Sequence, residues 1–216
     1  MTDAAWLRSL PTLTGDAPAL HLVNVPDDPI ALFRNWIAVA AEHGIPEPHA
    51  MTLATADADG RPAARVVLLT DVADGAWVFS TDARAGKAHD LAANPRAALT
   101  FYWQPLGRQV RVAGAVRLLD PEECAADFLR RSPSARAAAL ASRPGEPLRS
   151  VEDMVAAVGE ARARVDRDPR LVPSTWQLWA VEADEVELWQ GDHDRAHLRV
   201  RYSRDGDRWD RRLDWP

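Results

Sequence analysis

A small set of hydroxyl and cationic residues in the first half of the chain has the types and spacing of an anion-binding site. Ser80 and Thr81 lie where an apolar strand, residues 76–82, is expected to end, and Lys87 lies in the first turn of a helix predicted over residues 84–93. The N-terminal N–H groups of a helix favour phosphate, and a lysine adds a full charge. An ordinary capped surface helix has the same local sequence, so this stretch alone leaves both interpretations open.

Arg65 begins a run that bears on the same chemistry. Residues 66–69 are apolar at every position, which predicts a strand that is buried on both faces, inside a barrel or beneath a helix. A cation beside a buried strand needs an anionic partner. Turn-forming residues at 57–60 join this strand to a preceding one, in which Met51 and Leu53 alternate with more polar positions.

A second group of candidate residues lies near the C-terminus. Strand alternation places Trp189 on the same face as Glu187, and a tryptophan on a charged face is expected to meet a ligand or another subunit. If the next strand begins early enough, four cationic or potentially cationic residues alternate onto one face: Arg195, His197, Arg199 and Arg201. Such charges repel one another unless an anion or solvent compensates them, and a solvated sheet edge explains them equally well.

The elements that position these residues define an α+β, strand-rich chain. Acidic residues and Pro29 begin a helix that ends near Gly44. Further helices are predicted over 121–131, 135–141 and 150–165, and further strands over 96–103, 108–119, 174–181, 185–189 and 197–203, with a closing strand after the turn at 204–207. Cys124 falls among apolar helical positions and is expected to pack in the core. We expect one domain, residues 1–216, in which residues 1–26 form a loosely held arm.

Composition limits the class of protein. The chain has 216 residues, of which 47% are hydrophobic, so it can bury a sizeable core. A net charge of −6 argues against a general binder of nucleic acid or anionic membranes. One cysteine and the lack of a signal-like or membrane-spanning apolar run favour a cytoplasmic protein. His193 and His197 lack the supporting ligands of a metal site, so none is expected.

Taken in order, several segments together resemble the pyridoxamine 5′-phosphate oxidase family. They are M-T-L-A-T from 51, R-V-V-L-L from 65, V-F-S-T from 78, G-K-A-H from 86, N-P-R from 94, R-Q-V-R-V-A-G from 108, V-E-L-W-Q-G from 186 and R-A-H-L-R from 195. The resemblance covers residues 28–216. It implies an antiparallel split β-barrel with packed helices, a homodimer, and FMN held in clefts formed by both subunits.

The resemblance also implies a set of FMN contacts in this chain. Arg65 and Lys87 match the residues that bind the FMN phosphate, and Trp189 and Arg199 match C-terminal flavin contacts. The remaining matches are Val66, Val67, Leu68, Leu69 and Thr70 beside the flavin, Ser80 and Thr81 on the next strand, and Gln109 near the ring system. Gly86 stands where the family commonly has an arginine, and Pro144–Gly145 replaces a Gln–Ser pair, so some contacts to FMN are missing.

The substrate side departs further from the vitamin B6 oxidases. Thr70 stands where they carry a lysine that binds the substrate phosphate, while Asp127 and Ala135 replace a tyrosine and a serine of that phosphate site. Arg131 matches the remaining arginine. Arg195 and His197 match the pair that faces the substrate ring, which makes them the candidate catalytic and substrate-orienting residues. This pattern resembles the phenazine-biosynthesis branch, where a hydroxyl residue also occupies the position of Thr70.

The leading hypothesis is therefore an FMN-dependent oxidase of a small ring or amine-bearing substrate without a phosphate, with O₂ as electron acceptor, in secondary metabolism. The first alternative is a pyridoxamine or pyridoxine 5′-phosphate oxidase with a rearranged phosphate site. The second is a non-catalytic flavin-binding protein built on the same fold.

Overall fold

The computed structural model describes residues 3–15, 18, 22 and 25–216. The described part of the predicted N-terminal arm includes α1, a short helix with no buried side chain. The elements follow the chain in this order: α1 (Asp3–Ser9), α2 (Pro29–Glu42), β1 (Ala50–Ala56), β2 (Pro62–Ala73), β3 (Ala76–Asp82), α3 (Gly86–Ala93), β4 (Arg96–Trp103), a 3₁₀ turn η2 (Gln104–Leu106), β5 (Arg108–Leu118), α4 (Pro121–Arg130), α5 (Pro133–Ala141), α6 (Val151–Arg167), β6 (Trp176–Gln190), β7 (Leu198–Asp205) and β8 (Arg208–Asp214).

The strands form one sheet in the order β3-β2-β1-β4-β5-β6-β7-β8, and β3 also pairs with β6. Within the described residues this second pairing closes an antiparallel barrel of six strands, with β7 and β8 as additional strands. Barrel closure removes the exposed edges that an open sheet would present. The predicted α+β class and the split-barrel fold are confirmed.

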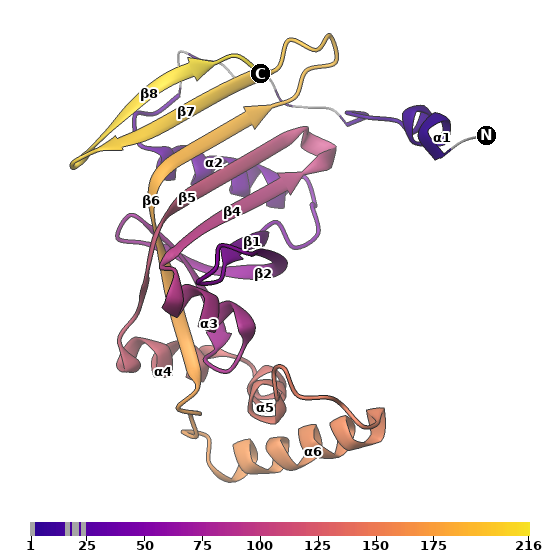
Figure 1. Cartoon of the computed structure of the whole chain (residues 1–216), viewed down its shortest axis with the longest axis vertical. Helices are drawn as coiled ribbons and strands as arrows, with labels where there is room; N and C mark the ends of the chain where they lie inside the picture. Colours follow the sequence, from indigo (N-terminus) through magenta and orange to yellow (C-terminus); the bar gives the residue numbers. More distant parts are fainter. Residues whose placement is uncertain (1–2, 16–17, 19–21, 23–24) are drawn as a thin grey trace. The chain divides into compact units, whose positions relative to one another are not determined.

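The chain divides into two compact units, and the strands β1, β4, β5 and β6 run through both. The first unit lies within Met1–Thr52, Ala98–Ala113 and Ala183–Pro216; the second consists of Leu53–Ala97 and Gly114–Glu182. Figure 1 shows α2, β7 and β8 of the first unit, and α3 to α6 of the second.

The core of the first unit is built on α2. The side chain of Asp28 accepts a hydrogen bond from the backbone N–H of Ile30, which caps the helix as its acidic start and Pro29 predicted. Phe33 on the buried face packs against Phe101 of β4, with ring centroids 4.9 Å apart. Pairing of β6 with β7 and of β7 with β8 adds strands to this unit.

The core of the second unit lies around the paired strands β3 and β6. Residues 76–82 pair in register with 176–182, so that Trp77 lies opposite Val181. Cys124 of α4 packs into a cluster with Val78 and Leu178, and its Sγ accepts a hydrogen bond from the Leu178 backbone N–H. The expectation that Cys124 is a packing residue is confirmed, and burial raises the pKa of its thiol.

Two expectations about strands are wrong. The two strands predicted over 174–181 and 185–189 form one continuous strand, β6, because no glycine or proline interrupts the intervening segment and the backbone pairs with β3 and then with β7. The strand predicted to be buried on both faces is not: Val66 is 69% exposed and Leu68 is 44% exposed. No residue of β2 is buried: Arg65, Val67 and Leu69 on one face are half-buried, while Val66, Leu68 and Thr70 on the other are exposed.

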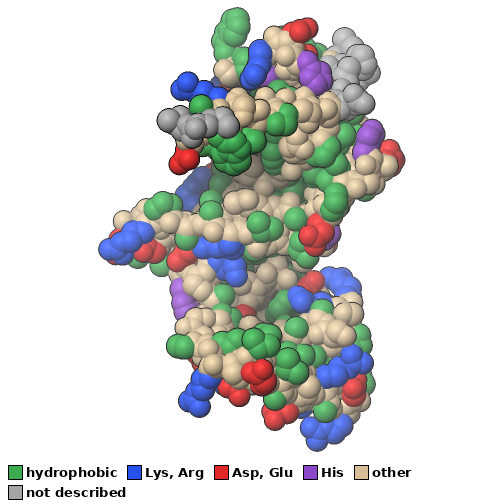
Figure 2. All heavy atoms as spheres, turned by 90° about the vertical axis from the view of Figure 1, so that its right-hand side faces the viewer, with side chains coloured by type: hydrophobic (Ala, Val, Ile, Leu, Met, Phe, Trp, Pro, Cys, Tyr) green, Lys and Arg blue, Asp and Glu red, His purple; other side chains and the backbone are tan. Residues whose placement is uncertain are grey.

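The surface mixes charges of both signs. On the face drawn in Figure 2, cationic, anionic and hydrophobic side chains are interspersed. None of the helices among the described residues is long and apolar enough to cross a membrane.

Candidate functional site

A cavity of about 400 Å³ in the second unit brings together several of the predicted site residues. Ser80 and Thr81 reach it from the end of β3, and Lys87 reaches it from the start of α3. Val67 and Leu68 of β2 contribute apolar surface, and Arg131 also lines the cavity. The cavity is also lined by residues that were not predicted, among them Asp82, Ala138, Ser142 and Trp176.

Lys87 is held by a hydroxyl group rather than by an acid. Its Nζ donates to Thr81 Oγ1 at 3.2 Å, and among the described residues no carboxylate lies within ion-pair distance of it. Burial, together with the nearby charge of Arg65, lowers the pKa of Lys87. Ala85, at the N-cap of α3, makes no side-chain capping bond, so the first N–H groups of this helix remain open to a ligand.

Arg65 projects from β2 toward the same helix. Its guanidinium donates to Thr55 Oγ1 at 2.7 Å and lies 3.6 Å from Asp90 Oδ2 of α3. Asp90 in turn accepts a hydrogen bond from Thr55 at 2.6 Å. Next to Lys87, a Cβ atom built on Gly86 would have nothing within 4 Å. The space beside Gly86, where the family commonly has an arginine, is therefore open and is not filled by another side chain.

Thr70 lies apart from the residues just described. It lines a second cavity, of about 220 Å³, together with Asp71, Asp127 and Arg130. Its hydroxyl donates to the Val78 backbone carbonyl at 3.0 Å. The predicted cofactor-binding strand thus divides between two cavities, with Val67 and Leu68 at one and Thr70 at the other.

Arg131 lies on an aromatic platform. Its guanidinium carbon is 4.3 Å from the ring centroid of Trp176, and Trp176 is fixed in turn by a 2.9 Å hydrogen bond from its Nε1 to Asp127 Oδ2. Asp127 is 8% exposed, and Phe128 packs edge-on against the same indole. Burial lowers the pKa of Arg131 while the charge of Asp127 opposes that shift. Asp127, which stands where the vitamin B6 oxidases carry a tyrosine of the phosphate site, therefore orients Trp176.

The first unit contains the other predicted residues. Trp189 of β6 packs its ring against the imidazole of His197, with centroids 5.1 Å apart. Gln109 of β5 is half-buried. The predicted face of four alternating cations is only partly formed, because β7 begins at Leu198 and leaves Arg195 and His197 in the turn before it. Arg195 has a left-handed backbone, with φ of 65°.

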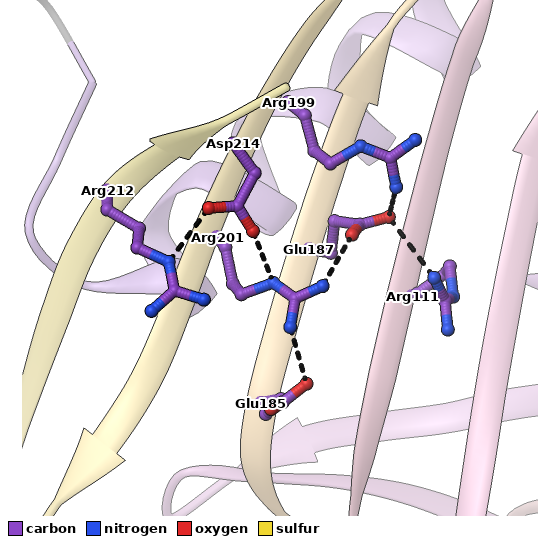
Figure 3. Close-up of polar contacts among 7 residues, drawn as sticks. All are labelled: Arg111, Glu185, Glu187, Arg199, Arg201, Arg212 and Asp214. Carbon is purple, nitrogen blue, oxygen red and sulfur yellow. Dashed lines mark hydrogen bonds and ion pairs between the residues drawn. The ribbon is translucent and has the colours of Figure 1, made fainter. Parts of the chain in front are cut away.

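Arg199 and Arg201 do lie on one strand face, and the protein's own carboxylates compensate them (Figure 3). Glu187, whose side chain is 6% exposed, lies 2.7 Å from Arg199, 3.3 Å from Arg201 and 3.4 Å from Arg111. Arg201 also pairs with Glu185 and Asp214, and Asp214 pairs with Arg212. The sequence left open whether an anion or solvent compensates these cations. For Arg199 and Arg201, carboxylates of the chain itself do so.

Sequence reasoning missed two kinds of residue. The sequence analysis named Glu187 only because it shares a strand face with Trp189. A usable signal was present, since arginines alternate along the next strand and one of them could lie opposite Glu187. Trp176 and Asp90 gave no local signal, because their contacts with Arg131 and Arg65 join segments distant in the chain.

The family model described as pyridoxamine 5′-phosphate oxidase matches residues 38–190, and the model of the pyridoxine 5′-phosphate oxidase C-terminal dimerisation region matches residues 176–216. The chain belongs to the pyridoxamine 5′-phosphate oxidase family, and its flavin oxidase-like character follows from that membership.

Relatives of two kinds are similar to the chain. The pyridoxine/pyridoxamine 5′-phosphate oxidase of Thermosynechococcus vestitus is 42% identical over 86% of this chain and 87% of its own length. The protein of the same name from Bordetella petrii is 44% identical over 82% and 84%. Among solved structures, PhzG from Burkholderia lata 383, in complex with tetrahydrophenazine-1-carboxylic acid, has a TM-score of 0.86 at 29% identity, covering 94% of this chain and 100% of PhzG.

Proposed function

We propose that the protein is an FMN-dependent oxidase of a small ring or amine-bearing substrate that carries a carboxylate and no phosphate. When bound, FMN would supply the redox chemistry, taking two electrons from the substrate and passing them to O₂. The protein's own residues would bind the cofactor, orient the ring and set the charge around it.

The second unit fits the phosphate of FMN. Arg65 and Lys87 lie close enough for the charge of Arg65 to lower the pKa of Lys87, and such mutual repulsion is relieved when an anion binds between two cations. The hydroxyls of Ser80 and Thr81 and the open N-terminus of α3 supply further donors. Gly86 leaves room without adding charge, so we expect FMN binding weaker than in relatives with an arginine there.

The homodimer expected from the family completes this site in our proposal. The C-terminal dimerisation region matched over residues 176–216 includes Trp189 and Arg199, and the exposed apolar side chains of Val66 and Leu68 need a covering surface. We propose that Gln109, Trp189 and Arg199 of one subunit contact FMN held by Arg65 and Lys87 of the other.

The charged residues that line the 400 Å³ cavity are the main support for a substrate with a carboxylate and no phosphate. Among its lining residues, Lys87 and Arg131 are cationic, and Lys87 is taken up by the FMN phosphate. Arg131 alone matches a carboxylate, whereas a phosphate dianion calls for a second cation. Asp82 in the lining and Asp127 beside Arg131 oppose a dianion further. The face of Trp176 suits a planar ring.

Anaerobic mixing of the FMN-loaded protein with dihydroaromatic carboxylic acids tests this function. We expect loss of the oxidised flavin absorbance, and its return when O₂ is admitted. In Arg131→Met, which removes the charge but keeps a long apolar side chain, kcat/KM for the carboxylate should fall roughly 10- to 100-fold. Turnover of the matching substrate without a carboxylate should change little. No flavin reduction by any such acid would refute the proposal.

A true pyridoxamine or pyridoxine 5′-phosphate oxidase is the second candidate, favoured by the names and 42–44% identities of the curated relatives. Steady-state turnover of pyridoxine 5′-phosphate and of dephosphorylated pyridoxine separates the two. A strong preference for the phosphate ester would select this second function over the first.

A further inference from the structure

The turn between β6 and β7, residues 191–197, is organised by one exposed residue, Asp192. Its carboxylate Oδ1 accepts hydrogen bonds from the backbone N–H groups of Asp194 at 2.8 Å and Ala196 at 3.3 Å. Its own carbonyl accepts from the Arg195 N–H at 3.1 Å. Asp192 therefore fixes the backbone on both sides of Arg195.

This support is needed because Arg195 adopts a costly backbone conformation. A φ of 65° lies in the left-handed region, which disfavours residues with a Cβ atom. Such conformations persist where surrounding contacts overdetermine them, and they occur preferentially at ligand-binding sites. Here those contacts come from Asp192.

The same residue determines the hydrogen-bonding state of His197. The Asp192 backbone N–H donates to His197 Nδ1 at 3.0 Å. A backbone amide can only donate, so Nδ1 must be the unprotonated nitrogen, and the neutral ring carries its proton on Nε2. The tilted contact with the Trp189 ring, whose centroid lies 5.1 Å from that of the imidazole, restricts the orientation of the His197 ring.

We propose that Asp192 is a positioning residue that holds His197 as the Nε2–H tautomer, so that the ring presents a hydrogen-bond donor to the substrate. A ligand facing His197 must then carry an acceptor, such as a carbonyl, carboxylate or ring nitrogen lone pair. This rests on the proposed function only in placing His197 beside the substrate. It also narrows the catalytic role open to His197, because removing a substrate proton through Nε2 would require the ring to give up its Asp192 bond or its existing proton.

The test begins with nitrogen-15 NMR of the full-length, FMN-loaded protein labelled at histidine. The His197 signals are identified by their loss in His197→Gln. We expect a protonated Nε2 and a pyridine-type Nδ1 without any substrate present. A ring protonated on Nδ1 alone would overturn the proposal, whatever the substrate turns out to be.

Variants of the turn then test the role of Asp192. Asp192→Ala removes the carboxylate acceptor, so we expect mixed His197 tautomers and a KM about fivefold higher for an acceptor-bearing substrate, with a smaller change in kcat. Asp192→Asn keeps the acceptor oxygen and should restore both. Asp194→Ala is the matched control, because the described structure shows no hydrogen bond to that carboxylate.

These outcomes separate the two proposals. If Asp192→Ala leaves the tautomer and KM unchanged, Asp192 does not position His197. If the tautomer is as expected and no acid reduces the flavin, the proposed function fails while the assignment of His197 stands.

Discussion

The two units each contain cations among the predicted ligand contacts, but the surroundings of these cations differ. The first unit has Arg199 and Arg201 on β7, and the second has Lys87 at the start of α3. In the first unit, Glu187 lies within 3.4 Å of three guanidinium groups. In the second, Lys87 is half-buried against a threonine hydroxyl, and burial and Arg65 lower its pKa. Cations paired with internal carboxylates contribute to the fold even where, as proposed for Arg199, they also contact a ligand, whereas the full charge of a desolvated cation without such a partner is available to an external anion.

This difference gives opposite expectations for substitutions in the two regions. Removing the central carboxylate of the first region should destabilise the protein, because it leaves the partly buried Arg199 without its carboxylate partner. Removing the cation of the second should leave stability intact and weaken ligand binding, because the desolvation of Lys87 already opposes folding.

The largest expected effect is that of Glu187→Ala. We expect it to lower the free energy of unfolding by about 2–3 kcal/mol, measured by urea denaturation, because Arg199 loses its carboxylate partner, while Arg201 keeps Asp214 and Arg111 is 56% exposed. Glu185→Ala is the matched control on the same strand: its side chain is 54% exposed, and the loss should be under about 1 kcal/mol. Equal losses in the two variants would contradict a special role for the buried carboxylate.

Lys87→Met should weaken FMN binding by roughly 10- to 100-fold, since one charge-assisted contact to phosphate is lost. Titration of the apoprotein with FMN, followed by quenching of flavin fluorescence, measures the change. Arg84→Met removes a cation that already pairs with Asp82 at 2.7 Å and should change FMN affinity little. If Lys87→Met lowered the free energy of unfolding as much as Glu187→Ala, the claim that Lys87 serves binding and Glu187 serves stability would be wrong.

Thr70→Lys tests whether an added cation creates a phosphate site. We expect affinity for pyridoxal 5′-phosphate to rise, by at most about tenfold, because Asp71 and Asp127 line the same cavity and would compete for the new ammonium group. Equilibrium dialysis against the labelled ligand measures it, with Thr70→Met as the control for side-chain size. Unchanged binding would mean that the discrimination against phosphate lies at another residue.

The smallest expected effect is a pH dependence of FMN affinity. The pKa of Lys87 is lowered from its usual 10.5, so the ammonium group loses its proton below that value and FMN affinity should fall as pH rises toward 10.5. Lys87→Arg keeps its charge and should flatten this dependence. In the ligand-free protein the sign reverses for folding: the unfolded chain binds more protons in this window, so stability should rise with pH. A wild-type affinity that stays constant over this range would contradict the assignment of Lys87 to the phosphate.

Alternation, turn residues and capping over short stretches of the sequence determined the α+β, strand-rich class and predicted that Ser80, Thr81 and Lys87 meet, which they do at one cavity. The family and the split barrel came instead from the resemblance of several segments taken in order. The sequence could not determine which faces of β2 are covered, since burial depends on which distant strands pair. Nor could it determine where β7 begins: Arg195 and His197 continued the alternation in the sequence but lie in a turn in the structure.

Charge compensation was likewise decided only by the tertiary structure. The sequence presents Glu187 and the arginines as separate charges, and pairing of β5, β6, β7 and β8 brings them within ion-pair distance. Asp192 is a further example, because its control of His197 depends on the path of a turn that no local pattern specified. Local sequence sets which side chains are available, but the free energy of a charge depends on its burial and its neighbours, and long-range strand pairing supplies both.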